Sequence, residues 1–282
     1  MQIPTLVFNG DRFPGKAITP EKFISEYWDY YPPEIMQRVN IKTRSLLNKE
    51  LVIFSPKGDL LPLSDPLPDK GLAIEFSRIR YCSDIAGFAS KYGLLGIESS
   101  DHYVYDPHWY NEPWVEYADD WLWASEKVLG LLNIYKQLQL NVGEILIWEG
   151  LPFLDLQCVE GKDLLTPREA MTVLAENITF QLQGVIDIGY EDIIPTTKTL
   201  TKFQVVEKRT TSYLIAAIYY DLWRMISLQE PVQVCKNCGL PFKIGKRRRD
   251  YCNNACRQEA YRKRLENHKD TNIKKQVIKT RN

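Results

Sequence analysis

The spacing of apolar residues predicts three amphipathic or buried helices in the second two thirds of the chain. Across residues 83–93, apolar side chains recur every three or four positions, with Ser83 placed to cap the start and Gly93 the end. The same spacing across residues 113–140 predicts a long second helix. Residues 211–228 are apolar around most of the helix circumference, so we expect this third helix to be largely buried.

The clearest helix start in the sequence is the segment Thr166-Pro167-Arg168-Glu169. Threonine is a good N-cap, proline fits the first helical position, and glutamate three residues after the cap can bond back to the cap's amide. Apolar residues then follow on one stripe as far as Leu182. This predicts a fourth helix with one face in the core.

Strands are predicted mainly near the N-terminus. The first 75 residues alternate short apolar stretches, such as residues 6–8, with turn formers such as Asn9-Gly10, which favours short strands and loops. Two further apolar runs, residues 145–148 and 151–156, are separated by Gly and Pro and predict a short hairpin. The expected fold class is α+β, with a mainly helical body and a short-stranded N-terminal region.

The charges are divided unevenly along the chain. The protein has 36 basic and 36 acidic residues, of which residues 235–282 hold 15 basic and 4 acidic, leaving 21 basic and 32 acidic in the remainder. An acidic body is therefore joined to a basic C-terminal part, and this asymmetry points to a polyanionic partner. The alternative is that the basic part docks on its own acidic body.

The sequence predicts a cytoplasmic protein that does not engage a membrane. The N-terminus lacks the pattern of a secretory signal, and the longest apolar run, residues 214–220, is far shorter than the about 20 residues needed to cross a bilayer. Two of the six cysteines, Cys82 and Cys158, stand apart from the others. Isolated cysteines of this kind are usually small buried hydrophobic residues.

The other four cysteines form a metal-ligand pattern. Cys235 and Cys238 are separated by two residues, 13 residues follow, and Cys252 and Cys256 are separated by three. Two close pairs joined by a short arm allow four thiolates to converge on one ion, and sulfur ligands favour Zn²⁺ as the cofactor. An iron–sulfur cluster uses the same ligands, and four ordinary buried or free cysteines are the remaining alternative.

The order of elements around these cysteines predicts a treble-clef-like zinc module. Gly239 allows a tight turn after the first pair, residues 240–251 can form a hairpin whose Phe242 and Tyr251 cover the metal, and a helix opens at Cys252. The expected division of the chain is an acidic body over residues 1–230, the zinc module over residues 231–266, and a basic tail over residues 267–282, for which order and disorder both stay open.

The module carries more basic residues than a zinc–thiolate site of formal charge −2 would attract. Arg257, Tyr261 and Arg264 recur at helical spacings of four and three, so they share one face that can bind phosphates and stack on a base or sugar. The alternative is a solvated helix on a structural zinc site. The predicted nucleic-acid-binding residues, for DNA in preference to RNA, are Lys243, Lys246, Arg247, Arg248, Arg249, Arg257, Tyr261, Arg262 and Arg264.

Residues 212–223, 234–242 and 251–257 resemble the bacterial ABATE-domain proteins that end in a CGNR-type zinc finger. The resemblance implies a mostly helical N-terminal domain, a four-cysteine finger and a role in regulating transcription. Residues 88–96 are also similar to a motif of related bacterial chains. The sequence departs from the family pattern after Cys256, where Arg257-Gln258-Glu259 replaces Gly-Asn-Arg, so the chain is at most a divergent relative.

An enzymatic function is not expected. A nuclease of the His-Asn-His type needs a histidine beside its metal, and none lies between Cys235 and Arg264. The sequence also lacks a Gly-rich phosphate loop and a nucleophile elbow. A candidate ligand pocket is formed by His102, Tyr105, His108 and Trp109. The alternative, which is the more common role of such a cluster, is an aromatic loop packed on the body.

The sequence therefore predicts a zinc-dependent DNA-binding transcription regulator. Its acidic body is expected to sense a small molecule or to bind a partner protein. The competing prediction is a zinc-stabilised adaptor that binds another protein and has no affinity for nucleic acid.

Overall fold

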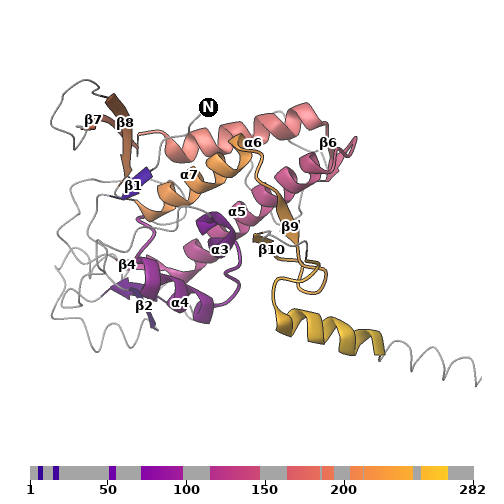
Figure 1. Cartoon of the computed structure of the whole chain (residues 1–282). Coiled ribbons are helices and arrows are strands. Elements are labelled where there is room, and N and C mark those ends of the chain that lie inside the picture. Colours follow the sequence, from indigo (N-terminus) through magenta and orange to yellow (C-terminus); the bar gives the residue numbers. More distant parts are fainter. Residues whose placement is uncertain are drawn as a thin grey trace, which may run out of the picture. The chain divides into compact units, whose positions relative to one another are not determined.

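The chain forms two compact units, Met1–Glu230 and Pro231–Asn282, which we call the body and the cysteine module. The computed structural model, shown in Figure 1, describes part of each unit. The described residues are 6–8, 15–18, 51–54, 71–97, 115–146, 164–184, 186–193, 204–211, 213–243 and 249–265. The predicted tail and most of the predicted short-stranded N-terminal region lie outside them.

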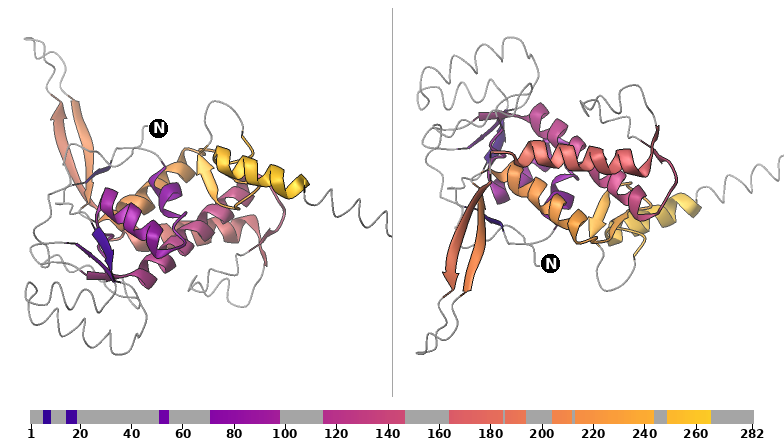
Figure 2. Two further views of the ribbon diagram at one scale, coloured as in Figure 1. Left: turned by 90° about the horizontal axis from the view of Figure 1, so that it is seen from below. Right: turned by 90° about the horizontal axis from the view of Figure 1, so that it is seen from above.

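The described part of the body is mainly helical and is organised around one long helix. Helix α5 (Ala118–Gln139) packs against α3 (Leu72–Phe76), α4 (Cys82–Tyr92), α6 (Pro167–Leu182) and α7 (Leu214–Ser227). Figures 1 and 2 show α6 and α7 lying side by side against it. Trp121 of α5 is completely buried, and so are residues on more than one side of the helix. This central position explains why residues 113–140 are apolar beyond a single stripe.

Helix α7 confirms the prediction of a largely buried helix. Its residues from Leu214 to Leu222 are all buried. Helix α6 confirms the predicted capping box: the Glu169 N–H donates to Thr166 Oγ1 at 3.3 Å, and the Thr166 N–H donates to Glu169 Oε2 at 2.8 Å. In α6 local capping and burial agree, whereas α7 has no side-chain hydrogen bond at its N-cap and depends on burial.

The predicted N-cap of α4 was wrong, whereas its C-cap is confirmed. The helix starts at Cys82, one residue before Ser83, because Asp84 Oδ2 accepts the backbone N–H groups of Arg80 and Tyr81 at 3.0 and 3.1 Å. This carboxylate in the first turn therefore bonds back to the backbone N–H of the N-cap residue Tyr81, which is one half of a capping box. At the other end, Gly93 has φ 88° and donates its N–H to the Ala89 carbonyl.

The predicted start of the long helix was also wrong. Residues Val115–Tyr117 form strand β4, which closes a three-stranded antiparallel sheet in the order β2-β3-β4. Strand β2 (Gly15–Ile18) and strand β3 (Leu51–Phe54) supply the other two strands. A strand of three residues directly before α5 gives too short a pattern to separate from the helix by periodicity.

Two further small sheets belong to the body. Strand β5 (Ile145–Leu146) pairs with β6 (Leu164–Leu165), while the predicted partner, residues 151–156, lies outside the described part of the chain. Strand β7 (Asp187–Ile193) pairs antiparallel with β8 (Gln204–Thr211), which also pairs parallel with β1 (Leu6–Phe8). This last sheet was not predicted. Among the described helices, none is long and apolar enough to cross a membrane.

A buried carboxylate of β4 holds the segment that follows α4. Glu116, which is 2% exposed, accepts the backbone N–H groups of Leu95, Gly96 and Ile97 at 3.0, 2.6 and 3.1 Å. It also accepts Trp121 Nε1 at 2.7 Å. The Leu95 carbonyl in turn accepts the Ile215 N–H of α7 at 3.0 Å. Residues 93–97 are therefore bonded on one side to β4 and α5 and on the other to α7.

A second buried carboxylate joins α7 to α3. Asp221 Oδ2 accepts the backbone N–H groups of Gly71 and Ala73 at 3.0 Å, at the start of α3. Its other oxygen forms an ion pair with Arg224 at 2.8 Å. Each buried carboxyl group in these two places is thus hydrogen bonded, as buried polar groups must be.

Candidate metal centre in the cysteine module

The four cysteines of the predicted metal site come together in the structure. The sulfur atoms of Cys235, Cys238, Cys252 and Cys256 all lie within 4.8 Å of one another. Sulfur atoms at the corners of a tetrahedron with metal–sulfur bonds of about 2.3 Å are about 3.8 Å apart. Two of the observed separations are 3.9 Å, from Cys238 to Cys252, and 3.5 Å, from Cys252 to Cys256. The cluster can therefore bind a metal ion.

The first cysteine pair lies in the turn of a hairpin. Strand β9 (Val232–Val234) pairs antiparallel with β10 (Pro241–Lys243). Between them the Cys235 N–H donates to the Leu240 carbonyl, and the Gly239 N–H donates to the Cys235 carbonyl, both at 2.9 Å. Gly239 has φ 72°, a conformation that glycine adopts without strain. The hairpin thus encloses the first pair. The hairpin predicted at residues 240–251 lies largely outside the described residues, which stop at 243 and resume at 249.

Backbone amides point at the sulfur of Cys235. Burial raises the pKa of this thiol, but the backbone N–H groups of Cys238, Cys252 and Asn237 outweigh burial and lower the pKa to about 6. The Leu240 N–H is directed in the same way at Cys238, although burial keeps that pKa above its usual value. Amides directed at sulfur favour the thiolate, which is the form that binds metal.

The second cysteine pair lies at the start of the helix formed by residues 254–265. Asn253 is the N-cap of this helix, because its Oδ1 accepts the backbone N–H of Cys256 at 2.8 Å. Burial and the neighbouring Cys252 thiol raise the pKa of Cys256 to about 12. A bound cation would reverse this rise, since coordinating thiols are deprotonated.

Side chains on the inner face of this helix tie it to the first cysteine pair. Asn237, which lies between the two cysteines, donates from Nδ2 to Glu259 at 2.9 Å and accepts from Lys263 at 3.4 Å. Glu259 and Lys263 also pair with each other at 2.9 Å. These polar contacts lie in solvent and are individually weak. With Cys256 they select which face of the helix turns toward the cluster.

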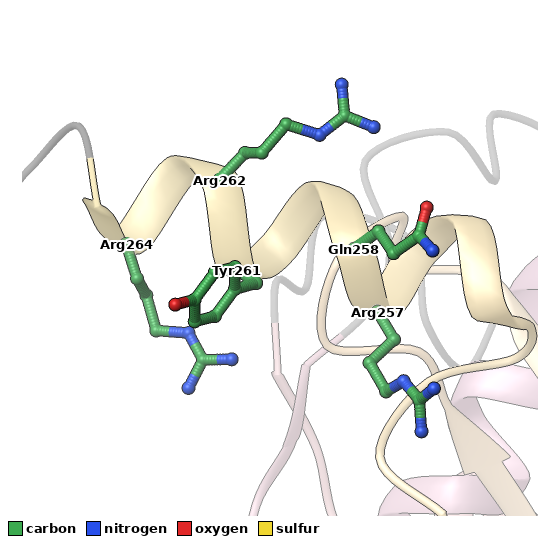
Figure 3. Close-up of a pocket in the computed structure, with 5 residues that line it drawn as sticks. All are labelled: Arg257, Gln258, Tyr261, Arg262 and Arg264. Carbon is green, nitrogen blue, oxygen red and sulfur yellow. The ribbon is translucent and has the colours of Figure 1, made fainter.

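The predicted nucleic-acid-binding residues of the helix lie on its other faces. Arg257, Tyr261, Arg262 and Arg264 are all exposed, with Tyr261 at 58%. Figure 3 shows Arg257 and Arg264 on one side of the helix and Arg262 on the opposite side. Together with Gln258 they border an open surface pocket. The prediction that Arg257 and Arg264 share a face agrees with this view.

Other predicted residues are placed in part or not at all. Arg249 is exposed, and Lys243 is the last residue of β10. Lys246, Arg247 and Arg248 lie outside the described residues, as does the candidate ligand pocket of His102, Tyr105, His108 and Trp109.

Within the described module, carboxylates pair with lysines and leave the arginines unpaired. Asp250 pairs with Lys236 at 3.1 Å, and Glu259 pairs with Lys263 at 2.9 Å. These are the two acidic residues of segments 231–243 and 249–265. No ion pair to another described residue is formed by Arg249, Arg257, Arg262 or Arg264. Among the side chains that the structure describes in this unit, the basic groups without an ion pair are therefore guanidinium groups, three of them on helix 254–265.

Sequence reasoning missed Asn237, Asn253 and Glu259, which position the helix. Asn253 could have been found, because an asparagine directly before a helical pattern is a typical N-cap. Asn237 and Glu259 lie 22 residues apart and carry no local signal of their contact.

Comparisons with protein-family models, curated proteins and solved structures found no match to this chain. The sequence resembles CGNR-type zinc-finger proteins, and the structure supports one part of this resemblance. That part is the four-cysteine cluster near the C-terminus, which has the composition of a zinc site.

Proposed function

We propose that this protein is a zinc-dependent DNA-binding transcription regulator that contacts DNA through the exposed faces of helix 254–265. The observation that carries the proposal is the set of unpaired arginines on this helix, Arg257, Arg262 and Arg264. An arginine that forms no ion pair within the protein keeps its guanidinium group available for an external anion. Guanidinium groups also bind phosphate oxygens in a bidentate geometry.

Zinc is the ion proposed for the four-cysteine cluster. Four thiolates at tetrahedral spacing suit zinc, and a closed set of four protein ligands is typical of a structural rather than a catalytic zinc site. Cys235 and Cys238 in a hairpin turn and Cys256 in the first turn of a helix also support a treble-clef-like arrangement. In such a module the metal supplies much of the folding free energy, so it would hold the helix in place for binding.

DNA is proposed in preference to RNA because the basic residues lie on a helix. The major groove of B-form DNA is wide enough for a helix, whereas that of A-form RNA is deep and narrow. The proposed role is binding, with no catalytic step assigned to the module.

The proposal is tested by measuring the salt dependence of binding to a duplex oligonucleotide. Each phosphate contact adds about 0.9 to the slope of log K against log salt concentration. Replacing both Arg257 and Arg264 with Ala should weaken binding and reduce that slope by about 1.8. The matched control is Arg168→Ala, an exposed arginine of α6 in the body, which should leave binding unchanged.

Measuring the zinc content distinguishes a variant that has lost a DNA contact from one in which the cysteine module has unfolded. Both variants should retain one zinc per chain, since neither changes a ligand or a side chain that is hydrogen bonded to one. An unchanged slope in the double variant would contradict the assignment of this face. A wild-type protein that binds no nucleic acid but forms a stable complex with a protein would support the adaptor function instead.

A further inference from the structure

The side of helix 254–265 that faces the module and the opposite, outer side differ in chemistry. Cys256, Ala260 and Lys263 follow each other at steps of four and three and face the module, where Cys256 joins the cluster. On the opposite side Gln258, Tyr261 and Leu265 follow at steps of three and four. This stripe, which we call the ridge, contains no charged residue. Tyr261 and Leu265 are 58% and 44% exposed.

Arginines flank the ridge on both sides. Arg257 and Arg264, seven residues apart, lie along one edge, and Arg262 lies along the other, as Figure 3 shows. The ridge is therefore an uncharged strip of one amide, one tyrosine and one leucine between two cationic edges. None of these three arginines forms an ion pair with a described residue.

This pattern matches the cross-section of the DNA major groove. The groove is about 12 Å wide, close to the diameter of a helix with its side chains, so the two edges of an inserted helix face the two phosphate strands. The middle of the helix then faces the base edges. Single-stranded nucleic acid offers one phosphate strand, so it would leave one cationic edge without a partner.

We propose, resting on the proposed function, that the ridge reads A·T base pairs in the major groove of duplex DNA. Gln258 would bond adenine N6 and N7, which a glutamine amide matches as donor and acceptor. Tyr261 and Leu265 would contact thymine methyl groups, which are the apolar feature of that groove. Recognition of guanine typically uses arginine or lysine at the base edges, and here the arginines lie on the flanks.

The test compares affinities for three probes of equal length: an A·T-rich duplex, a G·C-rich duplex and a single strand. The wild-type protein should bind the A·T-rich duplex at least five times more tightly than the G·C-rich one, since one good bidentate contact discriminates by about 1–3 kcal/mol. Gln258→Ala should remove most of this preference while leaving the zinc content and the salt slope unchanged. Gln183→Ala, an exposed glutamine of the body, is the control.

The outcomes separate this inference from the function on which it rests. Equal affinity for the two duplexes, a preference unaffected by Gln258→Ala, or tighter binding to the single strand would each overturn the reading of A·T pairs and leave DNA binding intact. Absence of binding to all three probes would overturn the proposed function itself.

Discussion

Glu116 offers the sharpest test of how the body is held together. Its two carboxylate oxygens accept four N–H groups, two on each oxygen, at distances of 2.6–3.1 Å. Replacing Glu116 with Gln keeps the size of the side chain but turns one oxygen into an NH₂ group. Two buried donors then face another donor and lose their acceptor.

The expected loss of stability follows from those two donors. Leaving one buried donor unsatisfied costs about 1–3 kcal/mol, so Glu116→Gln should lower the free energy of unfolding of the body by about 2–6 kcal/mol. That is a large part of the stability of a typical domain.

The assay is urea unfolding followed by tryptophan fluorescence. All seven tryptophans precede residue 231, so this signal reports the body and not the cysteine module. The control is Glu176→Gln on the exposed side of α6, which should change stability by less than about 0.5 kcal/mol. A loss of similarly small size in Glu116→Gln would refute the reasoning that the carboxylate holds residues 93–97 in place.

Three further predictions concern the same segment and the cysteine module. Gly96→Ala should destabilise the body by about 1–3 kcal/mol in the same assay, because Gly96 has φ +79° and a Cβ there would lie 2.9 Å from Tyr213 Cδ1. The control is Gly87→Ala in α4, where an added Cβ would have no heavy atom within 4 Å; it should be neutral or stabilising. Burial raises the pKa of the Glu116 carboxyl from 4.5 to about 7, although its four N–H donors act in the opposite direction, so the folded body binds the carboxyl proton more tightly than the unfolded chain does. The contribution of Glu116 to the free energy of unfolding is therefore full below pH 4.5 and is lost as pH rises through 7. The stability lost in Glu116→Gln should be larger at pH 5 than at pH 8. Cys252→Ser should reduce bound zinc from one to none per chain by elemental analysis and unfold the module, while the tryptophan-detected transition of the body stays unchanged.

The features predicted correctly from the sequence are those with a local cause. The capping box at Thr166 and Glu169 involves residues three positions apart, and the all-round apolar character of α7 is a property of a single segment. The four cysteines are recognisable by spacing alone, because the chemistry of the ion demands those residue types close together.

The features that were missed depend on residues far apart in the chain. Glu116 and Leu95 are 21 residues apart, and nothing around Glu116 shows that its carboxylate is buried. The pairing of β7 with β8 likewise joins two segments that carry few apolar residues, so period-two alternation gives no clear signal. The strand β4 and the Tyr81 cap were missed for a different reason, since element ends are the least certain part of a periodic pattern.

The four ligands of the cluster differ in their access to solvent. Cys235 is 1% exposed, whereas Cys238 is exposed and Cys252 and Cys256 are half-buried. A chelator or an oxidant in solution therefore has readier access to Cys238 than to Cys235. We expect ligand exchange to begin at Cys238 and not at Cys235.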